Sequence, residues 1–87
     1  MLLSQHARVR ACQRGIRLTA IEATLDYGFV ISQRGSVIYH LGKRSVKNAA
    51  LEGLDIREHK NTVVIVGSNG VIITVYKDAE IRHLRAH

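Results

Sequence analysis

The chain has 87 residues, of which 46% are hydrophobic and 23% charged, with one cysteine and no proline. This length fits a single domain, residues 1–87, and the hydrophobic fraction excludes an intrinsically disordered chain. A lone cysteine excludes an internal disulfide bond. No apolar run approaches the roughly 20 residues of a membrane-spanning helix. Since the N-terminus also lacks the pattern of a signal peptide, we expect a cytoplasmic protein.

The charge of the chain is strongly positive and unevenly distributed. Thirteen lysines and arginines against seven acidic residues give a net charge of +6. Residues 1–17 carry four arginines and no acid. Such a field attracts polyanions, so a nucleic acid or an acidic protein is the expected partner, and a membrane surface is the least favoured. The alternative is a basic surface without a partner.

The first predicted element is a helix that follows Ser4 and ends before Gly15. Serine is a preferred N-cap residue, and glycine commonly ends a helix. His6, Arg10 and Arg14 recur at four-residue steps, which places them on one face of this helix. The apolar residues of the segment form no single stripe, so core packing alone does not explain the helix.

The next segments predict a second helix, two strands and a short third helix. Thr19 and Glu22 form the pattern of a capping box at the start of the second helix, and Gly28 stands at its end. Residues 29–32 and 37–41 are typical of strands joined by a turn at 34–35. Residues 45–51 favour a short helix, capped by Ser45 and closed by Gly53.

The last predicted element is a β-hairpin. Asn69-Gly70 between two β-branched runs is typical of a type I′ turn, and a two-residue loop pairs Ile65 with Thr74. Because strand residues alternate between faces, Thr74 and Tyr76 project together, opposite a face that carries Val64, Val66, Ile73 and Val75. The predicted fold is α+β, with two N-terminal helices packed on a twisted four-stranded antiparallel sheet, in the order α-α-β-β-(short α)-β-β.

The helix row and the last strand together offer the groups that metal-independent RNA cleavage needs. Histidine exchanges protons near neutral pH, so His6 suits the acid or base that acts on the ribose 2′-hydroxyl and the leaving oxygen. Arg10 and Arg14 supply donors that stabilise the phosphorane, and hydroxyls of Thr74 and Tyr76 can orient the phosphate. The alternative is structural, with solvated or ion-paired arginines and a threonine that merely favours strand.

A second candidate set is suited to nucleic-acid binding. Lys43, Arg44 and Lys47 form a basic segment, and Tyr39 can stack on a base. A metal site is not expected: His83 and His87 are four residues apart, but no further ligand pattern accompanies them. No other cofactor motif is present.

Three motifs carry a family resemblance. Residues 4–16 read Ser-x-His-Ala-x-x-Arg-x-x-x-Arg-Gly-Ile, residues 39–44 read Tyr-x-Leu-Gly-Lys-Arg, and residues 63–76 end in Ser-Asn-Gly-x-Ile-x-Thr-Val-Tyr. In these motifs the chain resembles a family of small, uncharacterised bacterial domains that is similar to RelE-type toxins and to barnase- and colicin-type ribonucleases. The resemblance covers about residues 4–82 and is an argument by analogy.

The resemblance implies a toxin-like ribonuclease that is often encoded beside an acidic antitoxin or immunity protein. Polar positions of the family are matched by His6, Arg10, Arg14 and Thr74. Tyr76 is the next candidate for the site. The chain lacks the cluster of charged strand residues found in some RelE-type toxins, which argues against ribosome-dependent cleavage.

Two functions remain open from the sequence. One is a toxin-like endoribonuclease, which requires the first helix to lie across the face of the last strand that carries Thr74. The other is a non-catalytic basic module that binds nucleic acid or an acidic, antitoxin-like partner. The oligomeric state stays open, a homodimer included, and residues 1–3 and 83–87 are expected to be disordered ends.

Overall fold

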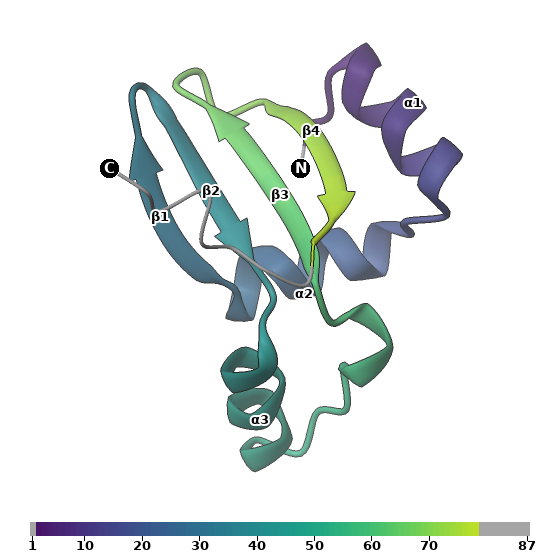
Figure 1. Ribbon diagram of the computed structural model, residues 1–87, viewed down its shortest axis with the longest axis vertical. Coiled ribbons are helices and arrows are strands. Elements are labelled where there is room, and N and C mark those ends of the chain that lie inside the picture. Colours follow the sequence, from purple (N-terminus) through teal and green to yellow (C-terminus); the bar gives the residue numbers. More distant parts are fainter. Residues whose placement is uncertain (1, 79–87) are drawn as a thin grey trace.

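The computed structural model describes residues 2–78 and shows an α+β fold (Figure 1). Within this range the sheet has four antiparallel strands in the order β1-β2-β3-β4. The predicted order of helices and strands is confirmed, and the predicted C-terminal end, residues 83–87, lies outside the described residues. The elements follow one another as α1 (Gln5–Arg14), α2 (Leu18–Tyr27), β1 (Phe29–Gln33), β2 (Ser36–His40), α3 (Lys43–Leu51), the 3-10 turn η1 (Arg57–His59), β3 (Thr62–Gly67) and β4 (Ile72–Lys77).

The main core lies between one face of the sheet and the first two helices. In Figure 1, α2 lies behind the sheet and α1 lies alongside β4. Strand residues of this side, here called the helix face, pack against small and aliphatic residues of the helices. The buried members of this cluster are Ala7, Ala11, Ile16, Ala20, Ile21, Val64, Ile72 and Val75. None of the helices in residues 2–78 is long and apolar enough to cross a membrane.

The start of α1 is fixed by a cap and by the sheet. The Ser4 side chain accepts a 3.0 Å hydrogen bond from the amide of Ala7, and Gly15 ends the helix at a φ of 64°, as the sequence predicts. Leu3 forms a parallel bridge with Ile72, and the amide of Ile72 donates to the carbonyl oxygen of Leu2 at 2.9 Å. From the sequence, residues 1–3 are expected to be a disordered end, whereas Leu2 accepts a hydrogen bond from β4 and Leu3 is bridged to it.

The cap of α2 differs from the prediction. The helix begins at Leu18 and its N-cap is Arg17, with no side-chain cap hydrogen bond, so the capping box at Thr19 is wrong. The carbonyl oxygen of Arg17 already accepts hydrogen bonds from the amides of residues 20 and 21, which closes the first turn two residues before Thr19. Gly28 ends the helix with a φ of −66°, and a Cβ there would collide with the carbonyl oxygen of Thr24.

The type I′ pattern occurs in the first hairpin, for which no turn type was predicted, and not in the second, for which it was. The β1–β2 turn has positive φ at Arg34 (38°) and Gly35 (78°), the pattern of a type I′ loop. At the β3–β4 turn, the amide of Gly70 donates to the carbonyl oxygen of Gly67 at 2.9 Å, and Gly70 alone of residues 68–70 has positive φ. The loop there spans residues 68–70, so the predicted type I′ turn at Asn69-Gly70 is wrong.

Because the loop is one residue longer than predicted, Ile72 lies on the helix face of the sheet and not on the face of Thr74. Ile65 pairs with Thr74 as predicted, but Val66 pairs with Ile72, and a β-bulge separates the two pairs. Ile72 therefore joins the core at 2% exposure, while Ile73 is 39% exposed. The prediction that Ile73 shares the face of Val64 is wrong.

The third helix packs below the sheet, where it forms a second, smaller core. It begins at Lys43 after the N-cap Gly42, so Ser45 is a buried residue inside the helix and not its cap. Ala49 packs against Leu41 and Ile56, in a cluster that also includes residues of α2. The predicted helix is confirmed, with its start two residues earlier than expected.

Candidate functional site

The first candidate site is built on α1, whose position is set by two alanines. Ala7 is completely buried and Ala11 nearly so, in the same cluster as Val64 and Val75. Small side chains let the helix approach the strand closely. The helix runs the length of β4, because Leu3 is bridged to Ile72 at one end and Gly15 and Lys77 line the same pocket at the other.

The alanine stripe divides the remaining side chains of α1 into two flanks. Each residue of an α-helix is rotated by about 100° from the one before. Arg8 follows Ala7 and lies on one flank, whereas His6 and Arg10 precede the two alanines and lie on the other. Arg14 comes at the next four-residue step, in the last turn, where the row has drifted to within about 20° of the direction of Ala7. We call the row of His6, Arg10 and Arg14 the basic flank.

The basic flank is turned away from α2. Arg8, on the other flank, lines a pocket of about 470 Å³ together with Leu18 and Glu22 of α2. The basic flank is therefore on the side of α1 away from α2. The face of the sheet opposite α2 is the one in front in Figure 1.

Thr74 and Tyr76 project from that opposite face. They alternate with Val75, which is buried on the helix face, and they pair with Ile65 and Val63 of β3. Helix α1 therefore does not lie across the strand face that carries Thr74, as the sequence analysis requires, because its alanines pack on the side of Val75. It lies beside the edge strand instead, so the arrangement that the sequence analysis required for a site shared by His6 and Thr74 is not the one observed.

The arginines of the basic flank are available to a ligand. Arg10 is half-buried and Arg14 is exposed. Within residues 2–78 neither forms an ion pair with Glu22 or Asp26, so of the structural alternative only the solvated form, and not the ion-paired form, agrees with the structure. No hydrogen bond in the described part of the chain links the basic flank to Thr74 or Tyr76 directly. A shared ligand would have to bridge them.

Tyr76 is held in its neutral form at this edge. Burial raises the pKa of its phenol above the ordinary value, and the charge of Asp78 adds to the effect. A tyrosine phenol is protonated at neutral pH in any case, and the raised pKa extends that range, so the Tyr76 hydroxyl can donate a hydrogen bond. It suits the orientation of a phosphate oxygen, and it does not suit the role of a base.

The comparisons with known proteins place the chain in a family. The sequence pattern of one family, a domain of unknown function (DUF4258), matches residues 3–77. The chain belongs to the DUF4258 family. No curated protein and no solved structure matches it. The match includes α1 and β4, and thus every residue of the first candidate site.

The second candidate set is only partly assembled in this DUF4258 domain. Lys43 and Lys47 line a groove of about 570 Å³ beside α3, here called the α3 groove. Arg44 does not line it. Tyr39 packs against the main core on the helix face, so it does not join the α3 lysines as a stacking partner.

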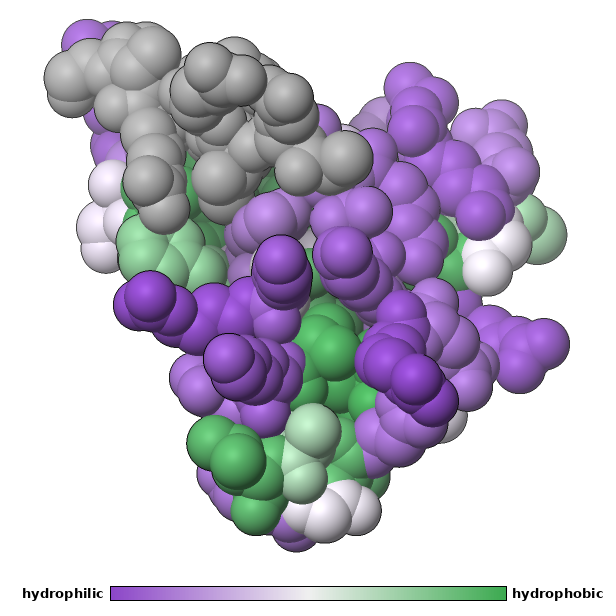
Figure 2. Space-filling view, turned by 60° about the horizontal axis from the view of Figure 1, so that its bottom comes forward, coloured by the Kyte–Doolittle hydropathy of each residue, from purple (hydrophilic) through white to green (hydrophobic). Residues whose placement is uncertain are grey.

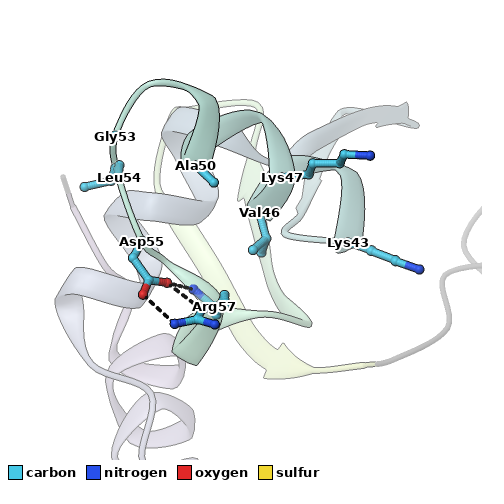
Figure 3. A pocket seen from close by; sticks show the side chains of 8 residues that line it. All are labelled: Lys43, Val46, Lys47, Ala50, Gly53, Leu54, Asp55 and Arg57. Atoms are coloured by element: carbon cyan, nitrogen blue, oxygen red, sulfur yellow. Dashed lines mark hydrogen bonds and ion pairs between the residues drawn. The ribbon is translucent and has the colours of Figure 1, made fainter.

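The side of the α3 groove opposite the helix was not predicted from the sequence. Leu54, Asp55 and Arg57 line it from the segment that follows α3 (Figure 3). One signal was present in the sequence, since Leu51 and Leu54 are aliphatic residues next to Glu52, Gly53 and Asp55. In the structure both leucines are exposed. Sequence spacing alone does not tell that the chain turns at Gly53, with a φ of 85°, and returns beside the helix.

The described residues hold no cluster of metal ligands. No three histidine, cysteine, aspartate or glutamate side chains in residues 2–78 come together at one place. His40 is buried, and its Nε2 lies 3.0 Å from the carbonyl oxygen of Asp78. This contact gives the buried ring a hydrogen-bond partner. The histidine pair at 83 and 87 lies outside the described residues.

Proposed function

We propose that this DUF4258 domain is a toxin-like, metal-independent endoribonuclease. The observation that carries the proposal is the position of the basic flank. It lies on the side of α1 away from α2, on a helix that runs beside the edge strand β4, and no acid of the described residues neutralises Arg10 or Arg14 by an ion pair. A histidine, unpaired arginines and neutral hydroxyls along one edge are the groups that phosphodiester cleavage requires.

The proposed reaction breaks the RNA chain by internal attack. His6 takes the proton of the ribose 2′-hydroxyl as the 2′-oxygen bonds to phosphorus. The bond from phosphorus to the 5′-oxygen breaks, and the protonated His6 returns the proton to that leaving oxygen. The products are a 2′,3′-cyclic phosphate and a free 5′-hydroxyl. Arg10 and Arg14 balance the added negative charge of the phosphorane, and Thr74 and Tyr76 donate hydrogen bonds that orient it.

The family resemblance adds two expectations to this proposal. A toxin-like ribonuclease acts on cytoplasmic RNA and is held inactive by an acidic antitoxin or immunity protein. The net charge of +6 suits both an RNA substrate and an acidic inhibitor. The likeness to RelE-type, barnase-type and colicin-type proteins rests on the sequence motifs alone.

Cleavage of purified RNA tests the proposal. The wild-type chain is incubated with a labelled RNA oligonucleotide in EDTA, with and without added ribosomes, and the product ends are identified by mass spectrometry. We expect cleavage without ribosomes and products that end in a cyclic phosphate. Intact RNA under both conditions would refute the proposal. Cleavage that EDTA abolishes would also refute it, because it would indicate a metal-dependent reaction.

The exposure of His6 favours a second function, a non-catalytic module that binds RNA through the same edge. In residues 2–78 no hydrogen bond fixes the His6 ring, and a catalytic histidine is usually oriented by a partner. Filter binding at several salt concentrations separates the two functions. A non-catalytic module would bind RNA with a steep salt dependence, would lose affinity in Arg10→Ala, would keep it in His6→Ala, and would leave the RNA intact.

A further inference from the structure

The α3 groove is a second surface, and it shares no residue with the proposed cleavage site. Its floor is aliphatic, formed by Val46 and Ala50 of α3 and by Leu54 of the returning segment (Figure 3). Figure 2, which brings the lower end of the molecule forward, shows an apolar strip with hydrophilic side chains on both sides. The groove is therefore an apolar channel with polar walls.

The floor of the groove leaves aliphatic surface in contact with water. Leu54 is 43% exposed. Together with Val46 and Ala50 in the same groove it presents an apolar surface of the kind that marks interaction sites. Burial of such surface favours association by about 25 cal/mol for each Å² removed from water.

The walls of the groove are positively charged and lack a free carboxylate. The guanidinium of Arg57 donates to both carboxylate oxygens of Asp55, at 3.0 and 2.9 Å. These hydrogen bonds lower the pKa of Asp55, whose carboxylate is paired with Arg57 in the structure. Lys43 and Lys47 form no ion pair with any residue of the described range. They point outward from neighbouring turns of α3 (Figure 3).

We propose that the α3 groove binds an acidic, amphipathic peptide segment of a partner protein. Aliphatic side chains of the peptide would cover Val46, Ala50 and Leu54, and its carboxylates would pair with Lys43 and Lys47. An RNA strand fits the groove less well, because no lining residue is aromatic and bases bind by stacking on aromatic rings. The proposal does not depend on RNA cleavage at the α1 edge.

Fluorescence anisotropy with a synthetic probe tests this proposal. The probe is a labelled helical peptide with leucines on one face and glutamates on the other. Leu54→Gln and the double variant Lys43→Glu/Lys47→Glu remove the floor and the charged wall. The controls are Leu51→Gln, which makes the same change as Leu54→Gln, and Arg44→Glu, which reverses one charge on the same helix; both residues lie outside the groove. A probe with lysine in place of glutamate and a single-stranded RNA oligonucleotide complete the set.

The expected result is saturable binding of the acidic probe to the wild-type chain. Leu54→Gln and the double lysine variant should each weaken it by about tenfold or more, while Leu51→Gln and Arg44→Glu change it by less than about twofold. The lysine probe should not bind. No saturable binding up to about 1 mM, or equal losses in the groove and control variants, would overturn the proposal. So would RNA binding that depends on Lys43 and Lys47 but not on Leu54.

Discussion

The amide of Ser4 donates a 2.9 Å hydrogen bond to the carbonyl oxygen of Ile72, which joins the N-cap of α1 to the first residue of β4. This bond sets the start and direction of the helix along the edge strand. Since Ala7 and Ala11 then meet the buried side of β4, the basic flank is left on the side away from α2. The candidate site thus depends on the register of one strand.

That register can be tested with two neighbouring isoleucines. Ile72→Ala should lower the free energy of unfolding by about 2–5 kcal/mol, because Ile72 is 2% exposed in the main core. Ile73→Ala should cost less than about 1 kcal/mol, because Ile73 is 39% exposed. Urea denaturation of both variants gives the comparison. Equal losses, or a larger loss at Ile73, would contradict the bulge.

These two isoleucines also show what the sequence could and could not predict. Hydrophobic alternation and glycines were sufficient for the element order and for the pairing of Ile65 with Thr74. The bulge was not predictable, because Asn-Gly fits both a two-residue loop and the end of a three-residue loop. The difference lies in the hydrogen bond from Gly70 to Gly67, which no residue type specifies.

The candidate site was predictable in its members but not in its arrangement. The four-residue spacing correctly placed His6, Arg10 and Arg14 in one row of a helix. Which side of the sheet that row would face depends on Ala7 and Ala11 being the buried residues, and two alanines give a weak hydrophobic signal against Val9 and Cys12. Tertiary packing made this choice, so the predicted crossing of the Thr74 face was wrong.

The hydroxyl of Thr74 provides a test of the strand side of the site. Thr74→Val keeps the shape of the side chain and removes a single hydrogen-bonding group at a half-buried position. If the hydroxyl orients the phosphate, RNA cleavage should fall by about five- to tenfold, the equivalent of one hydrogen bond. Thr74→Ser should retain most of the activity. Full activity in Thr74→Val would remove this residue from the site.

The raised pKa of Tyr76 predicts a dependence of stability on alkaline pH. The folded state holds the phenolic proton to higher pH than the unfolded chain does, so its contribution to stability is complete below the ordinary tyrosine pKa of about 10. That contribution is lost as the pH rises through the raised folded value. The wild-type chain should therefore lose stability relative to Tyr76→Phe above this pH. Parallel urea denaturation curves of the two proteins, at neutral pH and at a pH above the ordinary tyrosine pKa of about 10, would measure the difference.

The same comparison controls for the other shifted tyrosine. Tyr27 donates a 3.1 Å hydrogen bond to Glu52, which raises the pKa of its phenol, and it is present in both proteins. Its effect therefore cancels between the wild-type chain and Tyr76→Phe. A stability difference that does not change with pH would contradict the raised pKa of Tyr76.

The central claim is that the basic flank of α1 cleaves RNA, and paired substitutions on the two flanks test it most directly. Cleavage of one RNA oligonucleotide in EDTA is measured for the wild-type chain, His6→Ala, Arg10→Ala and Arg8→Ala, with circular dichroism to establish that each variant is folded. We expect His6→Ala to lose about 10²- to 10⁴-fold in rate and Arg10→Ala about tenfold or more, while Arg8→Ala retains the wild-type rate. Equal rates in folded His6→Ala and Arg8→Ala would contradict the claim.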